Sequence, residues 1–281
     1  MTPVNPVDSL PKDLLLGRNV FITGGGSGIN LGIAKSFASV GANVAICGRT
    51  RARLETAAVE LRALGVEVSI SAADVRDADA LEAAFETTRE ELGPVDTVVA
   101  GAAGNFFAPA ESISSNGFRT VLDIDLLGSF HTAQSAFAQL KETGGNLLFI
   151  SAGQSYLPFA HQAHVGAAKA GVDNLMRNLA LEWGQYGIRA NSIVPGPIEG
   201  TEGMERLTGP VGEDVWTRAV PLGRFGTVEE IGAMAVVLSS PLGSYVTGAQ
   251  IVVDGGLGLS GLGSLSQAVV AALPAGESNR K

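Results

Sequence analysis

Cysteine is almost missing from this sequence, while long apolar runs and an excess of basic charge are missing altogether. The chain of 281 residues holds one cysteine, Cys47, which excludes a disulfide within the chain. No apolar run approaches the ~20 residues that a membrane-spanning helix needs. Asp and Glu outnumber Lys and Arg by 28 to 19, whereas nonspecific nucleic-acid binding needs a broad basic surface. We therefore expect neither a nucleic-acid partner nor a membrane segment.

The two ends of the sequence carry no targeting signal of the common kinds. The N-terminus lacks the basic segment followed by an apolar one that marks a signal peptide. The last residues, Ser278 to Lys281, do not match a peroxisomal address. Cys47 ends an apolar run, which favours an inert core thiol over a reactive one. A cytoplasmic location is the expectation.

Short apolar runs alternate with amphipathic segments along most of the chain, and 46% of its residues are apolar. Strands are expected near residues 19–23, 43–47, 66–71, 95–100, 146–151, 188–194 and 250–253. Helices are expected after the first strand to about residue 40, and at 51–64, 77–92, 115–140, 163–186 and 227–239. This alternation predicts an α/β fold with one doubly wound parallel sheet of about seven strands and helices on both faces.

The chain reads as one domain with a tail. We expect a single Rossmann-type catalytic domain over residues 1–257, whose first 12 residues wrap its surface or are partly mobile. Residues 258–281 are rich in Gly, Ser and Ala and are expected to be weakly ordered.

A glycine-rich loop separates the first expected strand from the first helix. Glycines let the backbone turn sharply and approach a pyrophosphate, and the helix N-terminus offers unpaired N–H groups to it. A flexible turn is the alternative, but the position after the first strand of an alternating chain favours dinucleotide binding. The residues expected to bind are Gly24, Gly26, Ser27, Gly28 and Ile29.

The end of the second strand indicates which dinucleotide binds. An acidic residue there would hydrogen-bond an unmodified ribose, but Arg49, Arg51 and Arg53 follow instead. A guanidinium group can pair with a ribose 2′-phosphate, so we expect NADPH, with Arg49 as the main contact. A basic first turn of a solvated helix is the alternative. Asp74 and Val75, after the third strand, are expected to border the adenine.

At this point the sequence resembles the short-chain dehydrogenase/reductase family, from about Leu16 to Gly256. The resemblance rests on the glycine loop, Ala102-Ala103-Gly104, Lys169, Asn191, Pro195-Gly196-Pro197-Ile198 and Asp254-Gly255-Gly256. It implies that Ala102, Lys169, Pro195, Gly196 and Ile198 also contact the cofactor.

One departure from the family pattern affects the chemistry. Most members carry a catalytic Tyr four residues before the Lys, where this chain has Val165. The usual Ser falls on Ala152, beside Ser151, and the usual Asn of the long middle helix falls on Asp125. Ordinary alcohol dehydrogenation or 3-ketoacyl reduction is therefore not the expected reaction.

The pattern is similar to a narrower group, the peroxisomal-type 2,4-dienoyl-CoA reductases. The similar stretches are 102–106, 122–125, 164–169 and 195–203. The resemblance implies NADPH-dependent reduction of a 2,4-dienoyl-CoA thioester to a 3-enoyl-CoA in fatty-acid degradation. It also implies that Asp125 and Lys169 replace the missing Tyr, and it suggests a homotetramer built through the two long central helices.

These residues can be given roles in such a reaction, which needs donors for an oxyanion and a proton at the α carbon. Lys169 is expected to bind the nicotinamide ribose, and Asp125 to hold a water against Lys169 that delivers the proton. Asn105 can donate to the thioester oxygen while Phe106 packs on the acyl chain, and His164 can contact substrate or shuttle protons. The alternatives are a helix salt bridge for Asp125, a turn residue at position 105 and a helix-start histidine.

Some assignments stay open at this stage. Tyr156 follows the fifth strand and is a second candidate proton donor, and the glycine-rich segment Gly196 to Trp216 is either a lid over the acyl chain or a surface loop. No metal site is expected. The alternative functions are another enoyl-thioester or carbonyl reductase, and an NADPH-binding scaffold without activity. Neither the acyl-chain length nor its carrier follows from the sequence.

Overall fold

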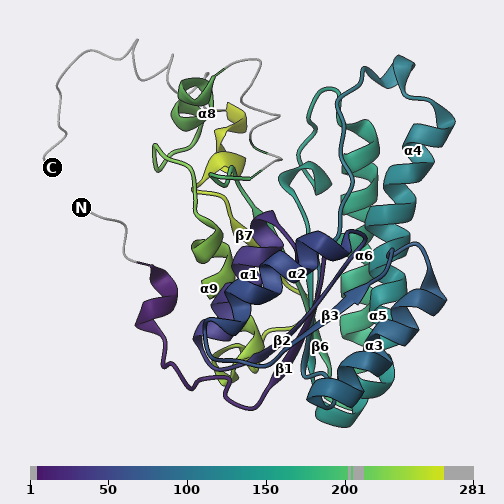
Figure 1. Cartoon of the computed structure of the whole chain (residues 1–281). Coiled ribbons are helices and arrows are strands. Elements are labelled where there is room, and N and C mark those ends of the chain that lie inside the picture. The colour runs from purple at the N-terminus through teal and green to yellow at the C-terminus, as the bar shows by residue number, and fades with distance from the viewer. Residues whose placement is uncertain (1–4, 202–203, 205–211, 263–281) are drawn as a thin grey trace, which may run out of the picture.

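The computed structural model describes residues 5–201, 204 and 212–262 (Figure 1). Seven parallel strands form one sheet in the order β3-β2-β1-β4-β5-β6-β7. The strands are β1 (Asn19–Thr23), β2 (Asn43–Gly48), β3 (Val68–Ala72), β4 (Thr97–Ala100), β5 (Asn146–Ile150), β6 (Arg189–Pro195) and β7 (Gln250–Val253). The predicted doubly wound parallel sheet of seven strands is confirmed.

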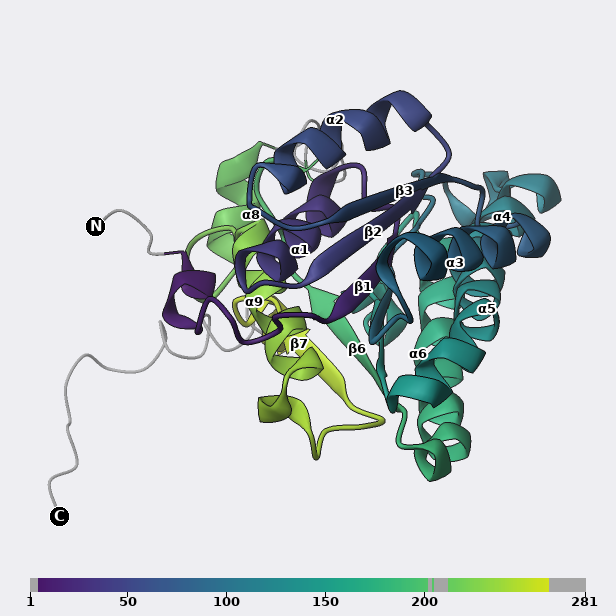
Figure 2. The same ribbon diagram turned by 60° about the horizontal axis from the view of Figure 1, so that its bottom comes forward.

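Helices cover both faces of the sheet. They are α1 (Gly28–Ser39), α2 (Arg51–Arg62), α3 (Ala78–Leu92), α4 (Ser115–Leu122), α5 (Gly128–Thr143), α6 (Ala163–Trp183), α8 (Glu213–Ala219) and α9 (Val228–Ser239). Figure 2 shows α1, α2 and α9 on one side of the sheet and α3, α5 and α6 on the other. Each side has its own apolar core, which explains why the central strands are apolar throughout their length.

The strand order places a crevice at the carboxyl edge of the sheet. The chain runs from β1 outward to β3 and then returns to β4, so that the loops after β1 and β4 diverge to opposite faces. Open parallel sheets bind ligands at such a switch point, outside the carboxyl ends of the strands. β1 is buried at all five positions and holds the edges of this crevice firmly in place.

The long helix predicted at 115–140 is interrupted. Asp123–Leu127 is a π-helical turn, labelled η3, between α4 and α5. Such wide turns are rare and are frequent at functional sites. Here the turn carries Asp125, whose side chain is 1% exposed.

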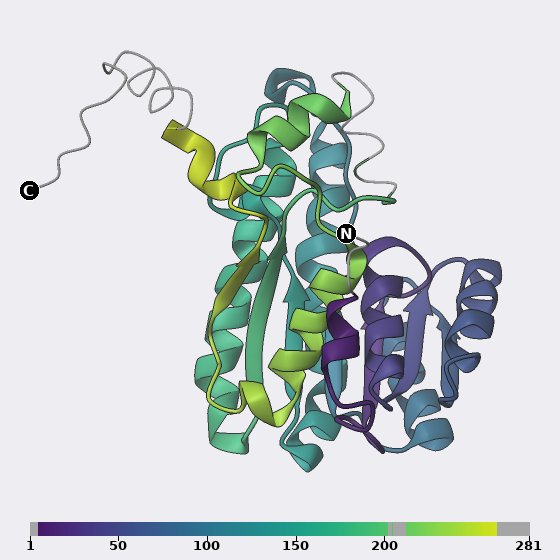
Figure 3. The ribbon, with the colours of Figure 1, turned by 90° about the vertical axis from the view of Figure 1, so that its left-hand side faces the viewer.

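Three segments differ from the sequence-based expectations or extend them. Near the N-terminus, Pro6–Ser9 forms a 3₁₀ helix whose Val7 is buried, and this helix packs against α9 (Figure 3). Helix α8 begins in the last residues of the segment 196–216, which was expected to be an irregular lid or loop, and ends at Ala219. Leu257–Leu262 is a 3₁₀ helix, whereas the rest of the expected tail lies outside the described residues. No helix in the described part of the chain is long and apolar enough to cross a membrane.

Candidate active site

The glycine loop turns where β1 passes into α1. Gly24 and Gly28 have φ angles of +71° and +56°, which side chains of other residues rarely allow. At Gly25 a Cβ atom would lie 2.5 Å from Cγ2 of Ile46, so the loop can approach β2 only because it lacks side chains. The loop therefore leaves room for a ligand phosphate at the N-terminus of α1.

A cavity of about 630 Å³ lies along the carboxyl edge of the sheet, from the glycine loop to the loops after β2, β3, β4 and β5. Eleven of the predicted site residues line it, namely Gly24, Gly26, Ser27, Gly28, Ile29, Arg49, Asp74, Val75, Ala102, Asn105 and Lys169. Its size and elongated lining suit a dinucleotide. The contacts themselves stay predictions.

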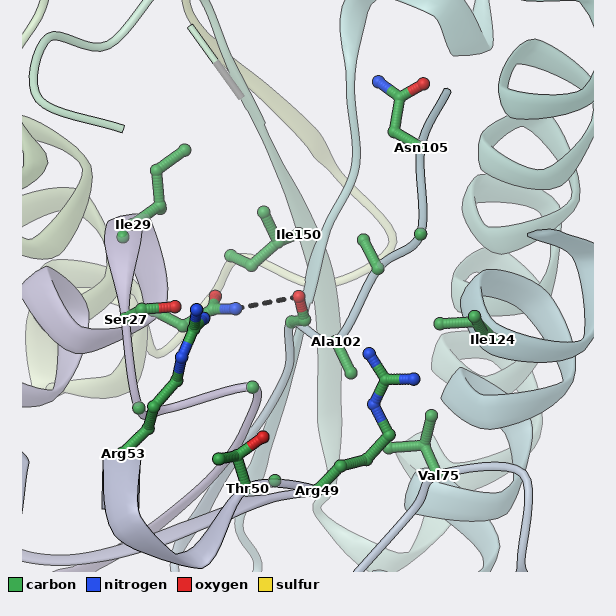
Figure 4. Close-up of a pocket in the computed structure, with 18 of the residues that line it drawn as sticks. Ser27, Ile29, Arg49, Thr50, Arg53, Val75, Ala102, Asn105, Ile124 and Ile150 are labelled. Atoms are coloured by element: carbon green, nitrogen blue, oxygen red, sulfur yellow. Dashed lines mark hydrogen bonds between the residues drawn. The ribbon is translucent and has the colours of Figure 1, made fainter. Parts of the chain in front are cut away.

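The basic residues after β2 lie at one end of this cavity. Figure 4 shows the side chains of Arg49 and Arg53 on either side of Thr50, with Asn105 at the opposite end. Arg76 forms an ion pair with Asp74 at 2.6 Å, and hydrogen bonding to Arg76 lowers the pKa of the Asp74 carboxyl. The positive charge of Arg49 also lowers the pKa of Asp74, but the ion pair that Asp74 forms is with Arg76.

Lys169 and Asp125 meet directly. The Lys169 ammonium is 3.2 Å from Oδ2 of Asp125, and the two side chains are 8% and 1% exposed. Lys169 Nζ also donates to the carbonyl oxygen of Ile150 at 2.9 Å. The sequence-based expectation placed a water between Asp125 and Lys169, but their contact is direct, because the wide turn of η3 brings the carboxylate to the lysine.

Asp125 also holds the loop that follows β4. Its Oδ1 accepts a hydrogen bond from the Gly104 backbone N–H at 2.7 Å. The same loop is tied at its start, where Thr23 Oγ1 accepts from the N–H of Gly101 at 3.0 Å. Asn105 comes directly after Gly104, so the carboxylate that faces Lys169 also fixes the position of the cavity residue Asn105.

Phe106 and His164 lie together, with ring centroids 4.1 Å apart. His164 is fully buried, and burial lowers the pKa of its imidazole below the usual value. Within the described part of the chain, neither ring nitrogen of His164 has a hydrogen-bond partner. These two residues are not among those that line the cavity, in contrast to Asn105, and their proposed contact with substrate stays a prediction.

The predicted cofactor residues after β6 do not line the cavity either. Pro195 ends β6, Gly196 packs on the backbone of Asp254, and Ile198 is 3% exposed. Thr201, which we did not predict, does line it, and its hydroxyl donates to the Ile198 carbonyl at 2.9 Å. Its position three residues after a predicted contact was the only available signal. Residues 202–203 and 205–211 of the expected lid lie outside the described residues.

The missing tyrosine has no replacement at its own position. Val165 is 4% exposed and packs with Val121 and Ala168. Tyr156 is 44% exposed, and burial of its hydroxyl end together with the nearby Asp254 carboxylate raises the pKa of its phenol. A raised pKa keeps the phenol protonated at neutral pH, but Tyr156 does not line the cavity that holds Lys169.

Comparison with known proteins agrees with this geometry. The sequence model of a family described as Enoyl-(Acyl carrier protein) reductase matches residues 24–258. This chain belongs to the short-chain dehydrogenase/reductase family. It is 43% identical over 249 residues to a protein of Saccharomyces cerevisiae named peroxisomal 2,4-dienoyl-CoA reductase [(3E)-enoyl-CoA-producing], covering 87% of this chain and 85% of the relative.

Two further relatives span most of the chain. An Arabidopsis thaliana protein with the same description is 44% identical over 258 residues, covering 88% of this chain and 87% of its own. A Bacillus subtilis protein named probable 2,4-dienoyl-CoA reductase [(2E)-enoyl-CoA-producing] is 40% identical over 245 residues, covering 85% of this chain and 96% of its own. The two names state different positions for the product double bond.

Solved structures of the family share the fold. A short chain dehydrogenase from Bacillus anthracis matches with a TM-score of 0.78 and 38% identity, over 86% of this chain and 96% of the other. A gluconate 5-dehydrogenase from Burkholderia cenocepacia, solved with NADP and tartrate, matches with a TM-score of 0.81 and 29% identity, over 88% of this chain and 98% of the other. This oxidoreductase family therefore accounts for both the sheet order and the site at its edge.

Proposed function

We propose that the protein reduces conjugated 2,4-dienoyl-CoA thioesters to 3-enoyl-CoA with NADPH, as a step of fatty-acid degradation. The observation that carries this proposal is the buried Lys169–Asp125 pair beside the cavity, in a chain whose usual tyrosine position is occupied by Val165. A conjugated thioester needs stabilisation of negative charge on oxygen and a proton at carbon, and neither requires a phenol.

The residues of the site suit the cofactor. The side-chain-free glycine loop gives room for a pyrophosphate, and Arg49 at the end of the same cavity suits a 2′-phosphate. Lys169 would hold the nicotinamide ribose. When bound, the cofactor supplies the hydride of the reaction.

Lys169 provides positive charge where the reduced thioester becomes an anion. An ammonium group has three protons, of which one is donated to the Ile150 carbonyl. The contact with Asp125 Oδ2 at 3.2 Å is an ion pair, and that oxygen accepts no hydrogen bond from a described residue. The other protons of Lys169 are available for the cofactor ribose and for a water that protonates the α carbon. Asn105, held through the Gly104–Asp125 hydrogen bond, is the proposed amide donor to the thioester oxygen.

The substrate assignment is tested by following NADPH absorbance with 2,4-hexadienoyl-CoA, crotonyl-CoA and acetoacetyl-CoA in parallel. We expect consumption with the dienoyl thioester. Turnover of crotonyl-CoA alone would indicate a 2-enoyl reductase instead, which the description of the matching family model would favour. Turnover of acetoacetyl-CoA alone would contradict the proposal and point to a carbonyl reductase. Tight NADPH binding without turnover of any thioester would leave the scaffold function.

The cofactor assignment is tested at Arg49. Replacing Arg49 with Ala should raise the KM for NADPH by about tenfold or more, because a charge-assisted hydrogen bond to phosphate is lost. The KM for NADH should stay within about twofold. Arg62→Ala, at the far end of α2, is the control. Equal losses with both cofactors would show that Arg49 does not read the 2′-phosphate.

Two further proposals concern the protein in the cell. We propose a homotetramer through the central helices, supported by exposed apolar residues there: Leu127 at 41%, Phe130 at 39% and Leu181 at 82%. Light scattering coupled to gel filtration would contradict this if the mass were that of a monomer.

We also propose a cytoplasmic location, although the yeast and plant relatives have peroxisomal in their names. Cell fractionation that finds the protein in organelles would contradict it.

A further inference from the structure

A second buried carboxylate lies one helical turn beyond Lys169. Asp173 on α6 is 2% exposed. Within the described part of the chain, no lysine, arginine or histidine nitrogen lies within ion-pair distance of it. A carboxylate buried without a cation is costly unless hydrogen bonds hold it, and the mechanism described above gives Asp173 no role.

Two residues that are far apart in the sequence donate to the same oxygen of Asp173. Ser151, directly after β5, donates its hydroxyl proton to Oδ2 at 2.9 Å. Gln250, the first residue of β7, donates from Nε2 to the same oxygen at 2.5 Å, and its Nε2 also lies 3.0 Å from the hydroxyl of Ser155. Asp173 therefore ties the end of β5, the start of β7 and the loop after β5 to α6.

Two successive turns of α6 hold two successive residues at the end of β5. Lys169 donates to the carbonyl of Ile150, and one turn later Asp173 accepts from the hydroxyl of Ser151. Ile150, Ser151 and Lys169 all line the cavity. Asp173 therefore fixes the strand end against which the Lys169 ammonium is oriented.

The same contact restricts what Ser151 can do. A serine hydroxyl has one proton, and the proton of Ser151 is directed at Asp173. A thioester oxygen that gains negative charge needs donors. Ser151 lies at the cavity next to the position where the family has its usual serine, but it has no second proton for that oxygen.

We infer that Asp173 is a positioning residue for Lys169, and that by holding the Ser151 proton it leaves stabilisation of the thioester oxygen to other donors. This inference rests on the proposed function. It names a residue outside the cavity as a determinant of cofactor binding, and it assigns Ser151 a supporting role in place of a catalytic one.

Ser151→Ala tests the second half of the inference. The kcat for the dienoyl thioester should fall by less than about fivefold, since one hydrogen bond of the support is lost while Gln250 still donates to the same Asp173 oxygen. Removal of a true oxyanion donor lowers kcat by about 10²–10³, and a loss of that size would overturn the assignment. Wild-type protein that turns over no dienoyl thioester would instead overturn the proposed function.

NADPH binding tests the first half, by fluorescence titration without substrate. Asp173→Asn should weaken NADPH binding about fivefold or more, because a neutral amide oxygen accepts more weakly than a carboxylate from Ser151 and Gln250, and the strand end beside Lys169 is then held less firmly. In a Lys169→Ala background the same substitution should change the Kd less than twofold, since the residue that Asp173 positions is gone. Equal losses in both backgrounds would mean a merely structural role and overturn the inference.

A double variant shows whether the single variant loses NADPH binding through misfolding or through the lost contact. Asp173→Asn combined with Gln250→Glu restores one carboxylate and one amide at the same contact, and should return the NADPH Kd to within about threefold of wild type. Glu182→Gln, on the exposed face of the same helix, is the matched control and should have no effect. Failure of the reversal in a protein with wild-type thermal stability would contradict the positioning role.

Discussion

At the scale of single residues, Val165 and Asp125 together define how this site differs from most of its family. Val165 packs into a small apolar cluster with Val121 and Ala168, so no proton-bearing group remains there. Asp125 compensates by pairing with Lys169 and by holding the Gly104 N–H. One carboxylate thus links the charge of the site to the position of Asn105.

Asp125→Asn should lower kcat by about 10² or more, because the carboxylate that faces Lys169 and accepts from the Gly104 N–H is lost from the proton path. The Kd for NADPH should change by less than about fivefold, since Lys169 still donates to the Ile150 carbonyl. Steady-state kinetics and a binding titration measure the two quantities separately. Asp123→Asn, two residues earlier on the same turn, is the control. An Asp125 variant that keeps full kcat would contradict the role given to the pair.

Gly101 and Asn30 form a second coupled pair. Asn30 Nδ2 donates to the Gly101 carbonyl at 2.8 Å, the contact drawn in Figure 4. A Cβ atom at position 101 would lie 2.2 Å from Oδ1 of Asn30. Gly101→Ala should therefore weaken NADPH binding about tenfold, and the additional change Asn30→Gly should recover part of that loss by removing the clash. Binding titrations that find the two effects additive would contradict the coupling.

The chemical type of most site residues was predictable from the sequence, but their contacts were not. The glycine loop and Arg49 follow strands, whereas Lys169 was indicated by the resemblance to the family, and all of them line the cavity. Asp173 gave no signal, because a helical aspartate one turn after a lysine resembles any solvated residue. Cys47 was expected to be inert; it is fully buried, and burial raises the pKa of its thiol to about 12.

At the scale of elements, helices α1 and α9 pack closely against each other. A Cβ at Gly232 of α9 would lie 2.0 Å from Oγ of Ser36 on α1, and one at Gly32 would lie 2.4 Å from Cβ of Val228. Two glycines, one on each helix, therefore allow the helices to approach closely. This packing holds α1 in place, and the N-terminus of α1 forms one wall of the cavity.

Gly232→Ala should lower the free energy of unfolding by about 1–3 kcal/mol, because the added methyl overpacks the α1–α9 contact. Helix propensity alone would predict stabilisation of up to about 1 kcal/mol. Gly184→Ala is the matched control, since nothing lies within 4 Å of a Cβ there. Urea unfolding of the two variants gives the comparison. A Gly232 variant as stable as the control would show that the helices can separate without cost.

The element boundaries show where periodicity fails as a signal. The helical pattern over 115–140 predicted one continuous helix, and the turn Asp123–Leu127 that breaks it preserves the apolar spacing well enough to stay hidden. The wide turn depends on contacts of Asp125 with residues far away in the chain, which no local pattern contains. Helix α8 was missed because glycines on its N-terminal side suggested an irregular segment.

At the scale of the whole molecule, the order of the strands decides where chemistry takes place. The alternation of apolar runs and amphipathic segments predicted the parallel sheet, since the crossover rule leaves few arrangements. The return of the chain from β3 to β4 beside β1 then brings residues that follow six different strands to one crevice. The substrate itself did not follow from these physical rules, because the same edge serves many reactions in this fold.

The position of the product double bond tests the central claim most directly. The wild-type protein is incubated with NADPH and 2,4-hexadienoyl-CoA in D₂O, and the product is analysed by NMR and mass spectrometry. We predict a 3-enoyl-CoA that carries one solvent deuterium at the α carbon, because the proton is delivered beside Lys169 at the thioester end. A 2-enoyl-CoA with deuterium at the γ carbon, or no product, would contradict the account.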